Sequence, residues 1–366
     1  MITSTTMPGR FGVFDNPEFA DSPHERVLFC HDRVSGLRCI IAIHSLALGP
    51  AVGGCRMYPY ADEASALLDV LRLSRGMTFK AAGTGLDHGG GKAVIIGDPH
   101  RDKSPGLFEA FGRFVDELGG RYITAGDAGT DSDDMDVIGR TTGYVAFRTV
   151  SAGGSGDSGP NTALGVLQAM RAGAQAQWGT SSLVGRTVGV EGLGKVGSRL
   201  AALLVDAGAT VIAGDIDERA VERVRAALPT VRFVRDVSSA ALDIYAPCAL
   251  GGTVNADAVD RITARLICGG ANNQLSTPDV EQRLTYRGAL WVPDFLASAG
   301  GLIQAAAEIA GQDAAETRQR VEGIFDTVER VVAHAAAHRM TTGAAARELV
   351  LQRIRSAAAA RALQNT

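Results

Sequence analysis

The sequence lacks the features that mark several classes of protein. Its five cysteines include no CxxC pair and no regular spacing, which argues against structural disulfides, a zinc knuckle and an oxidising compartment. No run of about 18 uncharged apolar residues is present, so no segment is predicted to cross a membrane. The first residues, MITSTTMPGRFGVF, lack the apolar centre of a signal peptide. We therefore expect a cytoplasmic protein.

The sequence also lacks an excess of one charge. It holds 36 Lys and Arg against 40 Asp and Glu, for a formal net charge of −4. This balance argues against nucleic acid as the main partner, since no broad electropositive surface is expected. A hydrophobic fraction of 46% and a charged fraction of 21% exclude a wholly disordered chain. At roughly 150 residues per domain, a chain of 366 residues is expected to form two domains.

Glycine is the residue present in excess. The 45 glycines make up about 12% of the chain, against roughly 7% in average usage. They follow no Gly-X-Y period, so we expect them in turns and at close backbone approaches rather than in a collagen helix. The run from Ser151 to Pro160 is rich in Gly and Ser, and it is interpreted as a loop or hinge between two domains.

Strands and helices are predicted in mixture before this hinge. Arg26–Asp32 and Leu37–His44 are expected to pair as a hairpin around a short turn. Apolar residues at helical spacing predict an amphipathic helix over Asp62–Arg75. A short buried strand is expected at Lys92–Ile96, and a further helix at Pro105–Leu118.

Short strands alternate with helices after the hinge. A helix is predicted over Thr162–Trp178, and the tail from Asp313 onward is predicted to be helical. Between them, the predicted strands are Arg186–Val190, Thr210–Gly214, Leu242–Ala246, Arg265–Cys268 and Ala289–Val292, and a helix is predicted over Lys195–Ala207. This alternation predicts an α/β fold with a parallel, doubly wound sheet.

A strand that runs into Gly192-x-Gly194-x-x-Gly197 and then a helix predicts a dinucleotide site. The three glycines permit a tight turn, a close approach to a pyrophosphate and close helix packing, and the helix start favours phosphate. Asp215 ends the next strand, where a carboxylate accepts hydrogen bonds from a ribose 2′-OH. Because that carboxylate repels a 2′-phosphate, NAD is expected rather than NADP, with Arg219 as the nearest base. The alternative is a glycine turn without a ligand.

Two lysines, Lys80 and Lys92, end glycine-containing motifs in the first domain. A phosphate-binding P-loop is excluded at Lys92, because Leu86 stands where the motif needs glycine and Ala93 follows where it needs Ser or Thr. From the residues alone, the lysines either lie on the solvated surface or meet in a cleft. His88 completes no set of metal ligands, and no metal site is expected.

A series of short motifs follows along the chain. They are GGCR at 53–56, GMTFK at 76–80, GLDHGGGK at 85–92, TAGDAGT at 124–130, GLGKVG at 192–197, DIYAPCALG at 243–251, GANNQ at 270–274 and PDFLASAGG at 293–301. In this order they resemble the leucine/valine/phenylalanine dehydrogenases, the branched-chain and aromatic arm of the glutamate dehydrogenase superfamily. The resemblance extends from about residue 26 to about residue 350.

The resemblance implies two domains with a deep cleft between them. An N-terminal α/β substrate domain is expected at residues 1–150, and a Rossmann-type NAD-binding domain at residues 151–332, with the C-terminal helix 333–366 packing back onto the first. The implied activity is NAD-dependent, reversible oxidative deamination of an apolar, branched-chain or aromatic L-amino acid. A homo-oligomer, a dimer or larger, is also implied. The alternative is a dinucleotide-sensing regulatory protein derived from the same fold.

The resemblance also implies a role for individual residues. Lys80 is expected to anchor the substrate carboxylate, Lys92 to activate water, and Asp127 to exchange protons with the amino group. A second cation nearby lowers the pKa of a lysine, so that it gives up its proton more readily. This property would suit Lys92 to activate water. The other residues assigned to the substrate are Gly53, Gly54, Asn272, Val52, Ala125, Leu302 and Ala305. The residues assigned to the cofactor are Gly192, Leu193, Gly194, Lys195, Val196, Gly197, Asp215, Ala246, Pro247, Cys248 and Asn272.

Some positions depart from the family's pattern. Ser298 stands in place of an asparagine, which predicts weaker positioning because serine offers fewer polar atoms and a shorter reach. Cys55 stands in place of a threonine and is expected to pack in the core. Gly126 stands in place of a larger residue and would either widen the pocket or loosen the loop. Val52 stands in place of the lysine that pairs with the distal carboxylate in glutamate-specific relatives. An apolar pocket is therefore expected to reject glutamate and to favour apolar side chains.

Overall fold

The contacts divide the chain into two compact units. The computed structural model describes residue 13, residues 16–249 and residues 251–364. Unit 1 takes Met1–Thr78 and His88–Arg148, and unit 2 takes Phe79–Asp87 and Thr149–Thr366. The segment tested for a signal peptide, residues 1–14, lies outside the described residues apart from Val13, as do Leu250 and the last two residues of the predicted C-terminal helix.

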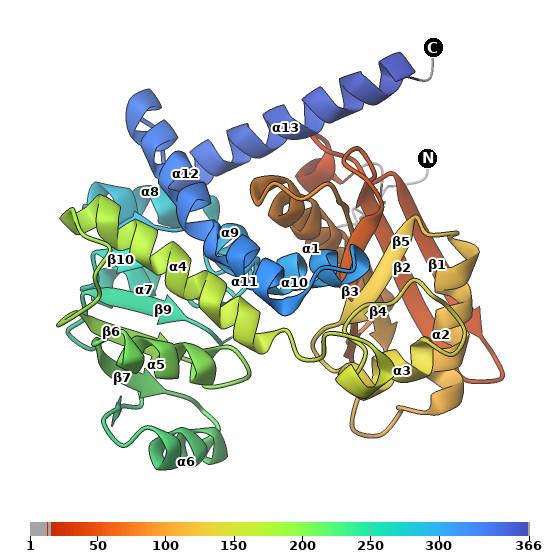
Figure 1. Ribbon diagram of the computed structural model, residues 1–366, viewed down its shortest axis with the longest axis horizontal. Helices are drawn as coiled ribbons and strands as arrows, with labels where there is room; N and C mark the ends of the chain where they lie inside the picture. Colours follow the sequence, from red (N-terminus) through yellow and green to blue (C-terminus); the bar gives the residue numbers. More distant parts are fainter. Residues whose placement is uncertain (1–12, 14–15, 250, 365–366) are drawn as a thin grey trace, which may run out of the picture. The chain divides into compact units, whose positions relative to one another are not determined.

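A five-stranded mixed sheet forms the centre of unit 1 (Figure 1). Its strands are β1 (Arg26–Asp32), β2 (Leu37–Ser45), β3 (Ala51–Tyr58), β4 (Gly89–Ile96) and β5 (Tyr122–Gly126). The order across the sheet is β1-β2-β4-β3-β5, with β1, β2 and β4 antiparallel in turn and β3 parallel to both β4 and β5. The predicted hairpin of β1 and β2 is confirmed, and β4, which carries Lys92, lies in the middle of the sheet.

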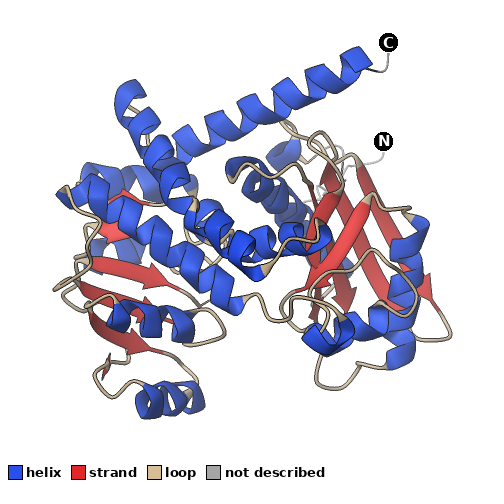
Figure 2. Cartoon of the chain, in the orientation of Figure 1, coloured by secondary structure: helices blue, strands red, loops and turns tan. Residues whose placement is uncertain are grey.

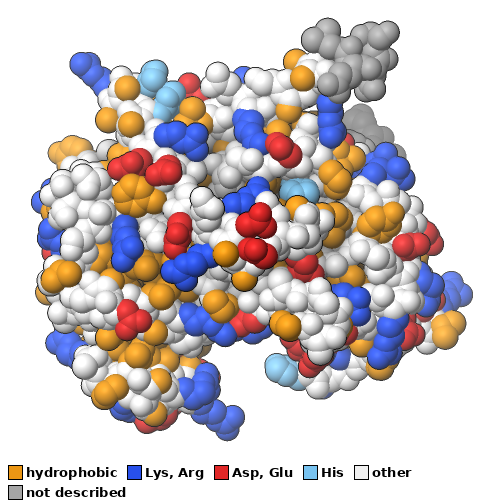
Figure 3. Space-filling view, in the orientation of Figure 1, with side chains coloured by type: hydrophobic (Ala, Val, Ile, Leu, Met, Phe, Trp, Pro, Cys, Tyr) orange, Lys and Arg blue, Asp and Glu red, His pale blue; other side chains and the backbone are white. Residues whose placement is uncertain are grey.

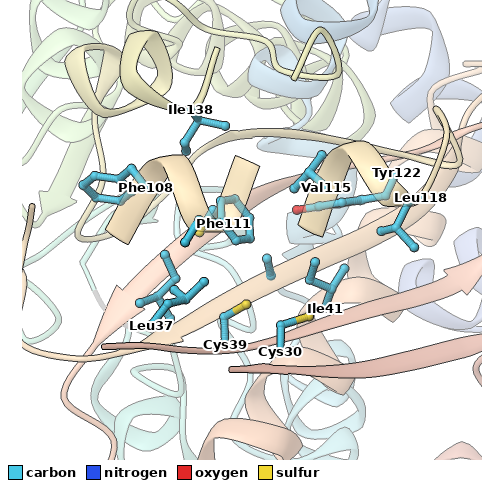
Figure 4. Packing of buried hydrophobic residues seen from close by; sticks show 14 of the residues in the cluster. Cys30, Leu37, Cys39, Ile41, Phe108, Phe111, Val115, Leu118, Tyr122 and Ile138 are labelled. Carbon is cyan, nitrogen blue, oxygen red and sulfur yellow. The ribbon is translucent and has the colours of Figure 1, made fainter. Parts of the chain in front are cut away.

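Helices cover both faces of this sheet. Helix α1 (Glu63–Gly83) packs over Ile40, Ala42 and Val94 on one face. Helices α2 (Pro105–Glu117) and α3 (Ser132–Ile138) cover the opposite face. Figure 4 shows this second core, where Phe108, Phe111, Val115, Leu118 and Ile138 pack over Leu37, Cys39 and Ile41. Successive strand residues point to opposite faces, so β1, β2 and β4 contribute to both cores, whereas β3 and β5 contribute to the second.

Several features of unit 1 differ from the sequence prediction, since β3, β5 and α3 were not predicted and α1 is longer than expected. Strand β3 was not predicted, because Gly53 and Gly54 interrupt the alternation of apolar side chains that marks a strand. Helix α1 continues to Gly83 instead of ending at Arg75. Gly76 follows the predicted end, but glycine costs only about 1 kcal/mol within a helix, and packing of the flanking turns outweighs this. The extension places Lys80 on the last turns of α1.

A parallel sheet forms the centre of unit 2, as predicted, and it has six strands where five were expected, because the short strand Arg232–Phe233 was not predicted. Its strands are β6 (Thr187–Glu191), β7 (Thr210–Gly214), β8 (Arg232–Phe233), β9 (Ile244–Pro247), β10 (Leu266–Ile267) and β11 (Leu290–Trp291). The order is β11-β10-β9-β6-β7-β8. The chain therefore runs outward from β6 in one direction and from β9 in the other. Ligands of such sheets bind at the carboxyl ends of the strands where the order reverses, here between β6 and β9.

Most of the helices belong to unit 2 (Figure 2). They are α4 (Gly159–Trp178), α5 (Gly197–Asp206), α6 (Glu218–Ala227), α7 (Ala256–Arg261), α8 (Pro278–Tyr286), α9 (Asp294–Ala297), α10 (Gly300–Ile309), α11 (Ala314–Glu322), α12 (Ile324–His338) and α13 (Thr342–Gln364). Short 3-10 helices lie at Pro17–Phe19 and Val150–Ala152. Helices α7 and α8 enclose one core with β9 and β10, and α4 approaches β10 so closely that Gly173 meets Leu266. The doubly wound α/β fold is confirmed.

The C-terminal helix α13 is held to the segment Phe79–Asp87. Arg353 donates hydrogen bonds to the carbonyl oxygens of Ala81, Ala82 and Leu86, and pairs with the Asp87 carboxylate at 2.8 Å. These contacts group the end of α1 with unit 2, although it precedes residue 150 in the chain. The limits of the functional domains remain a prediction.

The surface carries both signs of charge. Figure 3 shows Lys and Arg side chains interspersed with Asp and Glu on the face in view. Among the described residues, no helix is both long and apolar enough to cross a lipid bilayer.

Candidate functional site

Lys92 and Asp127 form an ion pair in unit 1. Lys92 lies on β4 opposite Ala42 of β2, and its Nζ atom is 3.1 Å from Asp127 Oδ1. The Lys92 side chain is only 6% exposed and that of Asp127 21% exposed. A buried ammonium group is stable only when it is paired, so the carboxylate satisfies a requirement that burial imposes.

The loop after β5 fixes Asp127 against β3. The Asp127 N–H donates to Thr130 Oγ1, and the Thr130 hydroxyl donates to the Cys55 carbonyl oxygen at 2.8 Å. Gly129 has a φ of 80°, which favours glycine. A Cβ atom on Gly54 would lie 2.7 Å from the Gly126 carbonyl oxygen and 2.9 Å from Asp127 Cβ. Glycine at position 54 therefore lets Asp127 approach β3.

Arg56 contacts the same carboxylate, and the sequence analysis gave it no role. Its Nε donates to Asp127 Oδ2 at 2.9 Å, and its NH1 donates to Asp69 Oδ2 at 2.9 Å. The Tyr60 hydroxyl also donates to Asp69 Oδ2, at 2.5 Å. The position of Arg56 at the end of the GGCR motif, beside Gly53 and Gly54, could have indicated that it belongs to the site.

The two cations keep Asp127 ionised. Burial would raise the pKa of Asp127, but Lys92 and Arg56 outweigh burial and lower it from 3.8 to about 2. Burial would likewise lower the pKa of Arg56, but the carboxylates of Asp127 and Asp69 outweigh burial and raise it. Asp127 is therefore a carboxylate at neutral pH, with one cation at each oxygen.

Lys80 belongs to a second group of polar side chains, in unit 2. Its Nζ donates to Ser298 Oγ at 3.0 Å, to the Ser298 carbonyl oxygen at 3.4 Å and to Asn272 Oδ1 at 3.2 Å. The Ser298 hydroxyl donates in turn to the Asp294 carbonyl oxygen at 2.7 Å. Burial raises the pKa of the Asp294 carboxyl. This effect outweighs the hydrogen bond from the Gln274 N–H and the charge of Lys80, which both lower the pKa. Although serine is shorter than the asparagine of the family pattern, the Ser298 side chain accepts a hydrogen bond from Lys80.

The remaining residues assigned to the substrate fall in both units. Val52 on β3 and Ala125 on β5 are buried in unit 1. Leu302 and Ala305 are buried on α10 in unit 2. At Gly126, a Cβ atom would meet nothing within 4 Å among the described residues, so the position has room for a larger side chain.

The glycine loop after β6 has the geometry of a phosphate-binding turn. Gly192 has a φ of 98°, and a Cβ atom at Gly197 would lie 1.8 Å from the Gly192 carbonyl oxygen. A Cβ atom at Gly194 would meet none of the described residues within 4 Å, so this backbone is open to a ligand. Asp215 Oδ2 accepts from the Leu193 N–H at 2.5 Å, and Asp215 Oδ1 accepts from the Asp217 N–H at 2.8 Å. An ionised carboxylate retains further lone pairs for a ribose hydroxyl.

The loops after β9 and β10 meet the glycine loop. The Cys248 N–H donates to the Glu191 carbonyl oxygen at 2.7 Å, and the Ala271 N–H donates to the Pro247 carbonyl oxygen at 3.0 Å. Burial raises the pKa of Cys248 to about 12, so its thiol is neutral. Cys248 also accepts from the Gly270 N–H. Lys195 and Val196 lie within the glycine loop. Ala246 lies near the end of β9, in the same region. The assigned cofactor residues thus gather at the strand ends where the sheet order reverses, and this arrangement fits a dinucleotide.

Comparison with known proteins identifies relatives along nearly the whole chain. The family profile described as Glu/Leu/Phe/Val dehydrogenase, dimerisation domain, matches residues 24–144. The profile described as Glutamate/Leucine/Phenylalanine/Valine dehydrogenase matches residues 216–362. Valine dehydrogenase of Streptomyces virginiae is 50% identical over 91% of this chain and 94% of its own length. Leucine dehydrogenase of Bacillus subtilis is 45% identical over 84% and 85%.

A solved structure supports the same relationship. The crystal structure of L-tryptophan dehydrogenase from Nostoc punctiforme superimposes with a TM-score of 0.78 at 38% identity, over 93% of this chain and 98% of the other. Sequence and fold therefore agree along the length of the protein, as the motifs predicted. The chain belongs to the glutamate, leucine, phenylalanine and valine dehydrogenase family.

Proposed function

We propose that this protein catalyses the NAD-dependent, reversible oxidative deamination of an apolar L-amino acid to its 2-oxo acid and ammonia. The observation that carries the proposal is the buried ion pair between Lys92 and Asp127, at the positions where the family resemblance expects the catalytic pair. The named relatives act on valine, leucine and tryptophan according to their names. They are enzymes, which favours catalysis over the alternative of a dinucleotide-sensing regulator.

Each proposed role follows from the chemistry of the group. Lys92 acts as a base in its neutral amine form, after its ammonium group has released a proton to solvent, and then takes the proton of the attacking water at Nζ. Asp127 exchanges protons with the substrate amino group at its carboxylate. Lys80 binds the substrate carboxylate through its ammonium group. The glycine loop from Gly192 and the carboxylate of Asp215 would hold the cofactor. When bound, NAD supplies the acceptor for the hydride that leaves Cα.

The proposed substrate has an apolar side chain. The assigned pocket positions are the four apolar residues Val52, Ala125, Leu302 and Ala305. Burying a carboxylate beside them without a partner would cost several kcal/mol, whereas each buried CH₂ group gains about 0.8 kcal/mol. Branched-chain and aromatic amino acids are therefore favoured, and glutamate is disfavoured.

The proposal is tested with the purified protein, NAD and a panel of L-amino acids at alkaline pH. Absorbance growth at 340 nm is expected with valine, leucine, isoleucine or an aromatic amino acid. The kcat/KM for glutamate is expected to be at least about 100-fold below that of the best substrate. Absence of turnover with every amino acid would favour the regulator, and glutamate among the best substrates would refute the pocket assignment, Val52 first.

We also propose a cytoplasmic homo-oligomer that assembles through its N-terminal region. The profile that matches residues 24–144 is described as a dimerisation domain, which supports this assignment. Analytical ultracentrifugation of the full chain should give a mass at least twice the 38.1 kDa of one chain. A monomer at micromolar concentration would refute the proposal.

A further inference from the structure

The guanidinium group of Arg56 connects two carboxylates from different parts of unit 1. Asp127 follows β5, and Asp69 lies on α1. Arg56 lies on β3 between them and donates from a different nitrogen to each, both at 2.9 Å. Its side chain is 22% exposed, so these bonds form largely away from water.

This geometry fixes the orientation of the Asp127 carboxylate. Lys92 holds Oδ1 at 3.1 Å and Arg56 holds Oδ2 at 2.9 Å. A carboxylate with one cation at each oxygen cannot rotate about its Cβ–Cγ bond without breaking a charge-assisted hydrogen bond, which is one of the stronger interactions available. If Arg56 were removed, Lys92 alone would still neutralise Asp127 but would allow the carboxylate to turn.

Asp69 and Tyr60 determine the position of Arg56 in turn. The Tyr60 hydroxyl donates to the same Asp69 oxygen that accepts from Arg56. Burial and the hydrogen bond to Asp69 raise the pKa of Tyr60, so the hydroxyl stays protonated and remains a donor. The planar fork of an arginine suits this bridging position better than the single ammonium group of a lysine.

We propose that Arg56 is a positioning residue for the reaction, and that it holds the Asp127 carboxylate in place while Asp69 and Tyr60 hold Arg56. The inference rests on the proposed role of Asp127 in proton exchange. Arg56 itself is assigned no contact with the substrate. Its effect is therefore expected on the chemical step, which depends on Asp127, rather than on binding of the substrate carboxylate.

The test is a set of steady-state kinetic measurements on Arg56→Met and Arg56→Lys. Arg56→Met should lower kcat by about 10- to 100-fold, since small misplacements of a reacting group cost up to about 100-fold. The KM for the amino acid should change by less than about threefold. Arg56→Lys retains the charge but loses the fork, so its kcat should lie between those of the wild type and Arg56→Met.

A double-mutant cycle with Asp127→Asn separates positioning from a general structural role. If Arg56 acts through Asp127, Arg56→Met should cost little further in the Asp127→Asn background, because the group it positions is already absent. An equal cost of Arg56→Met in both backgrounds would overturn the inference. Full activity of Asp127→Asn alone would refute the proposed role of Asp127 and, with it, this inference.

Lys103→Met is a matched control. Lys103 is another partly buried cation of unit 1, 27% exposed and paired with Asp134 at 2.5 Å. Its loss should lower the unfolding temperature without changing kcat. Should Arg56→Met fail to fold, the same cycle is run with Asp69→Asn, for which a loss of about 3- to 10-fold in kcat is expected. Wild-type kcat in Asp69→Asn would then overturn the inference.

Discussion

The two lysines that the motifs single out lie in contrasting surroundings. Lys92 is on the central strand of a five-stranded sheet, where neighbouring strands fix its backbone on both sides, and its ammonium group meets the Asp127 carboxylate. Lys80 is on the last turns of a helix that passes from unit 1 into unit 2, and its ammonium group donates to oxygens of Ser298 and Asn272.

This comparison indicates that the two lysines are suited to different roles. A group that takes part in proton transfer needs a fixed position and a neighbouring charge, and a strand within a sheet provides the fixed position. A group that binds a carboxylate needs a cation that a substrate can approach, and the end of a long side chain on a helix provides it. Substitutions at the two lysines and at their partners test this difference.

Replacing Lys92 should have the largest effect. Lys92→Ala removes the base that is proposed to activate water, and kcat should fall by about 1,000-fold or more, within the range for loss of a general acid–base group. NAD binding, followed by fluorescence titration of NADH, should be unchanged because the glycine loop lies in unit 2. A variant that keeps a tenth of the wild-type rate would remove Lys92 from this role.

Replacing Lys80 should act mainly on binding. Lys80→Ala removes a charged hydrogen-bond donor worth about 1.5 to 3 kcal/mol, so the KM for the amino acid should rise by about 10- to 100-fold. The KM for NAD is the internal control and should change little. A fall in kcat with an unchanged KM for the amino acid would contradict the contrast between the two lysines.

The ion pairs of Asp127 should appear in acid stability. Because its pKa is about 2 in the folded chain and 3.8 in the reference state, ionisation of Asp127 contributes about 2 kcal/mol to the free energy of unfolding. This contribution is complete above about pH 4 and disappears as the pH falls through about 2. Urea unfolding of wild type and Asp127→Asn should therefore differ most at neutral pH and converge towards pH 2. A difference that does not change with pH would contradict the charge assignment.

Cofactor choice should depend on Asp215. Asp215→Ser removes the carboxylate that repels a 2′-phosphate, so the ratio of kcat/KM for NADP to that for NAD should rise by about tenfold. It also removes the acceptor of the Leu193 N–H, so turnover with NAD should fall. Wild-type enzyme that turned over NADP faster than NAD at equal, subsaturating concentrations would refute the NAD assignment.

Restoring the family asparagine should have the smallest effect. Ser298→Asn exchanges the hydroxyl that accepts one charged hydrogen bond from Lys80 for an amide oxygen. Because the donor and its charge are kept, the difference should be about 1 kcal/mol or less, and the KM for the amino acid should shift by about two- to fivefold. The change should disappear in a Lys80→Ala background if it acts through that lysine. Unchanged kinetic constants in Ser298→Asn would show that position 298 does not tune the site.

Local patterns accounted for much of the fold and for part of the candidate site. The hairpin of β1 and β2 and the succession of β6, α5 and β7 were predicted because side-chain periodicity and glycine spacing act over a few neighbouring residues. Strand β3 was missed because its two glycines permit close approaches, of Gly91 to Gly53 and of Asp127 to Gly54, and do not favour a strand by propensity. A glycine in the sequence indicates that another group can approach the backbone closely at that position. It does not indicate which atom does so.

The sequence by itself determined the class of fold, the family and the positions of Lys80, Lys92 and Asp127 within recognisable motifs. Only the tertiary structure decided which groups meet: that Arg56 bridges Asp127 and Asp69, and that Ser298 reaches Lys80. Lys80 and Ser298 are 218 residues apart in the chain. Such contacts depend on how helices pack on a sheet, and ion-pair strength depends on the burial that this packing produces. The local spacing of residues predicts neither this packing nor this burial.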